Sequence, residues 1–162
     1  MISKRAIDRV CGVLLVLLPA VLITSIATGS KFETYKQTAM RSLQTIADNQ
    51  ALFMASTTFL FLTGLVSISL AAALYLSFRD HETTLALFGA IWVLVMGVTL
   101  IIGAVGGLVV DHMADAFDGT SGSNATMIAN SARPMQHIYE DSGLLGFGTF
   151  FPLSLPLPTI PC

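Results

Sequence analysis

The sequence predicts an all-α fold: an integral membrane helical bundle with three full transmembrane helices and a partial fourth. Two features of its composition support this class. Hydrophobic residues make up 54% of the 162 positions and charged residues only 11%, whereas an average soluble domain carries about 25% charged residues. The charged residues also gather in short clusters, and the stretches between the clusters are long enough to cross a bilayer.

Four stretches carry no Asp, Glu, Lys or Arg: residues 10–28, 51–78, 83–110 and 142–162. About 20 helical residues cross a hydrocarbon core of about 30 Å, and a charge at the helix centre costs about 2.5–3.5 kcal/mol. The first three stretches satisfy both conditions. As buried helices of a soluble protein they would need a polar covering layer, which this short chain lacks. We expect one bundle over residues 1–151, with spans at about 10–28, 51–78, 83–110 and 142–151.

The first span also has features of a secretory signal. Lys4, Arg5 and Arg9 precede the apolar run, and Ser25-Ile26-Ala27 resembles a cleavage site. Because the apolar run is longer than a typical signal sequence, we favour an uncleaved first helix.

The loop between the first and second spans has helical periodicity. Its apolar residues recur at intervals of three or four, the spacing of one helix face, at Phe32, Tyr35, Ala39, Leu43 and Ile46. Three arrangements fit: a helix lying at the membrane surface, an extension of the second span, or a helix packed on its neighbours.

The two later loops differ in length. The short one, residues 79–82, makes the second and third spans antiparallel neighbours. The long one, residues 111–141, contains a flexible stretch, and residues 127–133 are expected to form a short helix that ends before Pro134.

The fourth stretch begins as an apolar helix at residues 142–151 and changes abruptly. Four prolines follow, at 152, 156, 158 and 161, and a lipid-facing helix does not tolerate that loss of backbone donors. We expect residues 152–162 to form a proline-rich tail, and this change of composition is typical of a truncated or frameshifted end.

Small residues indicate where the spans pack. Gly103 and Gly107 form a GxxxG pattern, which allows two helix backbones to approach closely. Thr63, Ser67 and Ala71 form a small, partly polar stripe on the second span. We expect these two faces to meet within the chain; the alternative is that the glycine face forms a homodimer.

One group of residues is a candidate metal site. Asp111, His112 and Asp115 close the third span, while His137 and Glu140, with Asp141 beside them, precede the fourth; the favoured ligands are His112, Asp115, His137 and Glu140. Imidazole and carboxylate together suit zinc or another divalent metal. The alternative is a solvated acidic rim at the helix ends. We assign no catalytic residues and expect no cofactor.

The chain resembles DUF4386, a family of uncharacterised bacterial multi-span membrane proteins. The resemblance covers most of the chain and rests on residues 9–14, which open the first span, and on the polar first loop before a long second span. It also uses residues 73–76, the short turn through Arg79, residues 84–88, and residues 137–147 at the start of the fourth span. Members of the family usually continue through further spans. The resemblance implies a membrane bundle and supplies no activity.

These observations favour a non-enzymatic structural or partner-binding membrane module. One alternative is a permease or channel fragment acting as an oligomer, although ionisable residues at depth, which such proteins usually need, are absent from the predicted spans. A second is a metal-dependent membrane enzyme. The expected partners are the lipid bilayer and either a second copy or another membrane protein. A net charge of -2 gives no support for nucleic acid. We expect the cell membrane, crossed several times, with the N-terminus in the cytoplasm.

Overall fold

The computed structural model describes residues 4–29, 32 and 38–148, with side chains described through residue 142. This part of the chain contains five α-helices and no strand, so the predicted all-α class is confirmed. The helices are α1 (Lys4–Gly29), α2 (Ala39–Asp48), α3 (Gln50–Phe78), α4 (Thr83–Phe117) and α5 (Ser123–Gly148).

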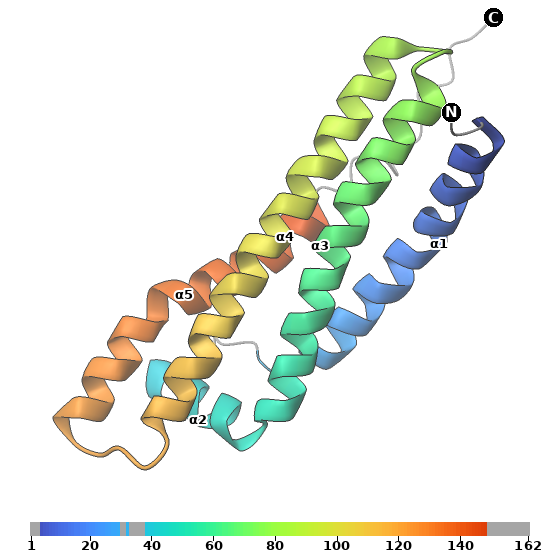
Figure 1. Ribbon diagram of the computed structural model, residues 1–162. Coiled ribbons are helices and arrows are strands. Elements are labelled where there is room, and N and C mark those ends of the chain that lie inside the picture. The colour runs from blue at the N-terminus through green and yellow to red at the C-terminus, as the bar shows by residue number, and fades with distance from the viewer. Residues whose placement is uncertain (1–3, 30–31, 33–37, 149–162) are drawn as a thin grey trace, which may run out of the picture.

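Three of these helices, α1, α3 and α4, are long and apolar enough to cross a membrane. They lie side by side with α3 in the middle, while α5 packs on α4 and α2 lies across the lower end of the bundle (Figure 1). The predicted turn between the second and third spans is confirmed, since the amides of His81 and Glu82 both donate to the Phe78 carbonyl. α3 and α4 are therefore antiparallel neighbours.

α3 and α4 approach closely at two glycines, Gly64 and Gly97, where a Cβ on either would lie 2.8 Å from the carbonyl oxygen of the other. The glycine face expected from the sequence also packs within the chain, but one turn or more away from Ser67 and Ala71. Gly103 lies against Leu60 and against Ser142 of α5, and Gly107 lies against Thr57 and Tyr139. Ser67 and Ala71 are buried nearer the turn. The GxxxG face of α4 thus packs against both α3 and α5, and not against the small residues of the second span alone.

The expected loop over residues 111–141 is wrong. α4 continues to Phe117 and α5 begins at Ser123, which leaves a link of five residues. In that link Gly119 and Gly122 have positive φ angles of 79° and 73°, a conformation that glycine adopts without steric cost. The clustered aspartates predict the end of the third span, but charged residues end only the part of a helix that can lie in hydrocarbon, and the helix itself continues. Buried Ala114 and Phe117 continue its apolar face.

The expected helix end at Pro134 is also wrong, because α5 runs through it. Proline removes one backbone donor, so the carbonyl of Asn130 loses its partner. Both Asn130 and Pro134 are exposed, and water can satisfy that carbonyl. Residues 142–148 of the predicted fourth span are the last part of α5, and α5 is not among the candidate spans. Residues 149–151 and the proline-rich tail lie outside the described residues.

α4 is too long for the bilayer alone. Its 35 residues extend about 52 Å at about 1.5 Å per residue, whereas the hydrocarbon core is about 30 Å thick and takes about 20 residues. With a core of that thickness placed directly after Glu82, its far boundary falls near Gly103. Ser142 of α5 packs against Gly103. The charged residues of α5 all precede Ser142, so they lie on the side of this level away from the α3–α4 turn. We call the part beyond this level the headpiece: α2, residues 50–57 of α3, residues 104–117 of α4, the link, and α5 through residue 142.

Candidate functional site

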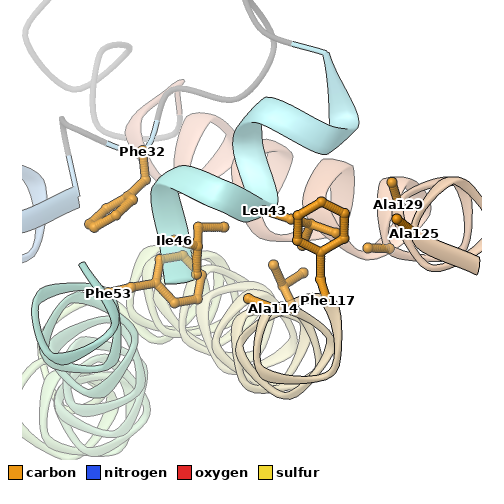
Figure 2. Packing of buried hydrophobic residues seen from close by; sticks show 10 residues of the cluster. Phe32, Leu43, Ile46, Phe53, Ala114, Phe117, Ala125 and Ala129 are labelled. Atoms are coloured by element: carbon orange, nitrogen blue, oxygen red, sulfur yellow. The ribbon is translucent and has the colours of Figure 1, made fainter. Parts of the chain in front are cut away.

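The headpiece has an apolar core of its own. Leu43 and Ile46 of α2 point toward α3 and α4, and Ala114 and Phe117 of α4 lie next to them (Figure 2). The predicted amphipathic helix of the first loop is thus confirmed from Ala39 onward, as α2, while Tyr35 of the predicted pattern lies outside the described residues. It ends at Asp48 before α3 begins, and its apolar face is buried against protein. Of the three arrangements considered, the structure has the helix packed on its neighbours.

Buried polar side chains tie the helices of the headpiece together. Gln136 of α5 donates to the hydroxyl of Ser42 on α2, at 3.1 Å, and both residues are buried. A buried side-chain hydrogen bond contributes about 0.5–1.5 kcal/mol to stability. Removing one partner costs more, because the other polar group is then buried without a hydrogen bond. This pair therefore specifies how α2 sits on α5.

A second polar group lies where α1, α3 and α5 meet. The hydroxyls of Tyr139 and Ser56 are 3.0 Å apart, and Ser56 also donates to the carbonyl of Ser25, at 3.5 Å. The Tyr139 ring contacts Phe53, with a centroid distance of 5.3 Å. Burial raises the pKa of Tyr139, and the hydrogen bond with Ser56 opposes that shift. The phenol stays protonated at neutral pH and can donate.

Asp111 is the buried carboxyl group of the headpiece. It is 8% exposed, and Gln50 is its hydrogen-bond partner. One turn further along α4, Asp115 accepts a 2.7 Å hydrogen bond from the Gln50 amide at the surface. The two carboxyl groups and Gln50 place polar oxygen atoms around the junction of α3 and α4.

The four candidate metal ligands are divided between two helices. His112 and Asp115 are exposed on α4; on α5, His137 is exposed and Glu140 is half-buried. Gly106 packs against Met135 and Tyr139, so His137 lies beside Gly106, six residues, or about 9 Å, from the level of His112. Among the described residues, no group of three or more His, Cys, Asp and Glu side chains is placed to hold a metal ion.

The opposite end of the bundle holds the exposed charges of the α3–α4 turn. Lys4 pairs with Asp80 at 3.2 Å, and Ser77 donates to Asp8 at 2.9 Å. The hydrogen bond and charge of Lys4 lower the pKa of Asp80. These contacts hold the start of α1 against the end of α3, on the side of the bundle away from the headpiece.

Together these features define a class: an all-α membrane protein with three apolar spans and a helical headpiece at one end. A family model described as a domain of unknown function (DUF4386) matches residues 10–158. The chain belongs to this family. No curated protein and no solved structure matches it.

Proposed function

We propose that the chain is a non-enzymatic module of the cell membrane that binds a partner protein through its headpiece. The observation that carries this proposal is the length of α4, which exceeds the thickness of a hydrocarbon core by about 20 Å and which packs with α2 and α5 at the end away from the α3–α4 turn. A folded layer outside the membrane provides a rigid surface for another protein. A protein that served only as a membrane anchor would not need such a layer.

The charge of the headpiece supports a docking role. Its described residues carry six acidic side chains and two arginines: Asp48, Asp111, Asp115, Asp118, Glu140, Asp141, Arg41 and Arg133. An excess of one sign steers an oppositely charged partner and makes its association rate depend on ionic strength. A basic partner surface is therefore expected.

The close packing of the spans supports this function over the permease alternative. Gly64 and Gly97 bring α3 and α4 into backbone contact, so that interface leaves no room for a path. Transport would require a path enclosed by several copies. We propose that the N-terminus lies in the cytoplasm, because Lys4, Arg5 and Arg9 flank the first span directly. The headpiece then lies on the outer side.

Photo-crosslinking in native membranes tests the proposal. A crosslinking amino acid replaces Met127, which is 65% exposed on the headpiece, or Val16, which is 73% exposed on the apolar face of α1. We expect a discrete adduct with another protein from position 127, none from position 16, and a several-fold lower yield when Asp115 and Asp118 are changed to lysine. Recovery of monomer alone from both positions would contradict partner binding. Adducts with the chain itself from position 16 would favour an oligomeric permease.

A further inference from the structure

Basic side chains gather at the end of the bundle that holds the α3–α4 turn, and two of them have no acidic partner. Lys4 and Arg79 both pair with Asp80, with N–O distances of 3.2 and 3.7 Å. Within the part of the chain that the structure describes, Arg5 and Arg9 form no ion pair, and both are exposed. These two guanidinium groups are therefore free to bind an anion from outside the chain.

Arg5 and Arg9 lie on the face of α1 that points away from α3. They are one helical turn apart and so share a face. The buried residues of α1 recur every seven positions and mark the face toward α3: Cys11, Leu18 and Ser25. Arg9, Val16 and Ile23 recur at the same interval about 200° further round the helix, and Val16 is 73% and Ile23 63% exposed. The outward face of α1 therefore carries two arginines at its start and apolar side chains after them.

The contacts of α1 fix the depth of these arginines. Ser77 donates to Asp8, and Lys4 pairs with Asp80. The first turns of α1 are therefore level with the end of α3 and the α3–α4 turn, where the chain leaves the hydrocarbon. Helix side chains lean toward the N-terminus, and an arginine buries its stem in apolar surroundings while its charged group stays at the interface. Both guanidinium groups thus reach the polar headgroup region of the bilayer.

We propose that Arg5 and Arg9 together bind the phosphate group of an anionic phospholipid, whose acyl chain lies along Gly12 and Val16. Guanidinium groups offer paired N–H donors that match phosphate oxygens. The two positive charges favour a lipid with net negative charge over a zwitterionic one, whose own ammonium group offsets its phosphate. A free phosphate ion would leave the apolar face after Arg9 unused. Lipid binding here requires only that α1 crosses the membrane, and it is independent of any partner of the headpiece.

Quenching of a single tryptophan by brominated lipids tests this site in vesicles. The full chain carries Trp92→Phe and one new tryptophan, either Gly12→Trp beside the arginines or Gly89→Trp on α4 as the control. A Cβ at either glycine has nothing within 4 Å, so both positions have room for a larger side chain.

Position 89 is matched to position 12 in depth and differs from it in charge. The Asp8–Ser77 contact places residue 12 opposite residue 73 of α3. The Gly64–Gly97 contact places residue 73 opposite residue 88 of α4, so the two reporters lie at about the same level. Residues 83–110 contain no charged side chain, and the control therefore reports a lipid contact without arginines.

Vesicles contain phosphatidylglycerol and phosphatidylcholine, and each lipid is brominated in turn, so the two degrees of quenching give a relative affinity. At position 12 we expect a preference of about fivefold or more for phosphatidylglycerol, roughly the effect of one basic residue near an anionic surface. At position 89 we expect none. Arg5→Gln with Arg9→Gln should lower the preference at position 12 to that of the control. Arg5→Lys with Arg9→Lys should keep most of it, and so should Arg79→Gln, since Arg79 is paired with Asp80.

Three results would overturn the proposal. The first is an equal preference at positions 12 and 89. The second is an unchanged preference at position 12 in the double glutamine variant. The third is loss of the preference when inorganic phosphate replaces chloride at constant ionic strength, which would assign the arginines to a free anion. If the Gly12→Trp protein does not fold, Val16→Trp, one turn further along the same face, provides the same measurement.

Discussion

Gly64 of α3 and Gly97 of α4 are in direct backbone contact: a Cβ on either would lie 2.8 Å from the carbonyl oxygen of the other. In a membrane, apolar burial does not drive helices together, so close packing and the interactions it permits carry the association. At this contact the backbones of the two central spans approach closely.

Gly64→Ala or Gly97→Ala should destabilise the bundle, because the added methyl group forces the two backbones apart. Overpacking of this kind costs about 1–3 kcal/mol. Denaturation in SDS–detergent mixtures measures the loss. Gly89→Ala is the matched control, since nothing lies within 4 Å of a Cβ there. A loss equal to that of Gly89→Ala would show that the close contact contributes nothing.

Leu43→Ala should unfold the headpiece before the spans. Leu43 is fully buried between α2 and its neighbours, and truncation of such a residue costs about 2–5 kcal/mol. Hydrogen exchange should therefore increase in α2 and in the first half of α5, with little change in the middle of α3. Met40→Ala, on the exposed face of α2, should alter exchange very little. Equal effects of the two changes would mean that α2 is not packed as described.

Tyr139→Phe should reduce stability by about 0.5–1.5 kcal/mol, because the buried Ser56 hydroxyl loses its 3.0 Å hydrogen bond with Tyr139 and keeps only the longer one to the Ser25 carbonyl. The Ser56→Ala variant and the double variant complete a cycle, in which the double variant should cost less than the sum of the single ones. Tyr75→Phe, a half-buried tyrosine near the other end of α3, serves as the control. Strict additivity in the cycle would contradict a direct Tyr139–Ser56 interaction.

The Lys4–Asp80 pair should make the start of α1 sensitive to acid. Lys4 lowers the pKa of Asp80 in the folded state, so its contribution is present above the ordinary carboxyl pKa, about 3.9. That contribution is lost as the pH falls through the folded-state value. At pH 7, Asp80→Asn should speed hydrogen exchange at the first turns of α1, and the difference should vanish once the pH is low enough to protonate Asp80 in the folded state. A difference that persists at that pH would assign the effect to something other than the charge. Because the pair is exposed, added salt should also weaken it.

The positions of the spans could be predicted because charge is expensive in hydrocarbon, and so the clusters at residues 4–9 and 79–82 mark where the chain leaves it. The antiparallel arrangement of the second and third spans could be predicted because the loop between them, residues 79–82, is short. The continuation of α4 past Asp111 could not be read by the same rule. Outside the membrane a helix needs only one apolar face, and its charged residues then carry no boundary information.

The candidate site was harder to predict than the spans. Asp111 was visible as the first charge after the third span, but its burial depends on how α3 and α5 cross α4. Gly64 and Gly97 lie in no repeated small-residue pattern with each other, and only the crossing of the two helices pairs them.

Cysteine accessibility tests the central claim, that three spans separate the headpiece from the α3–α4 turn across a membrane. In a background with Cys11→Ser and Cys162→Ser, single cysteines are placed at Thr120 in the headpiece link or at His81 in the turn, and intact cells are treated with a membrane-impermeant maleimide. We predict that Thr120→Cys is labelled in intact cells and that His81→Cys is labelled only after the membrane is opened. Labelling of both positions from the same side of an intact membrane would contradict the account.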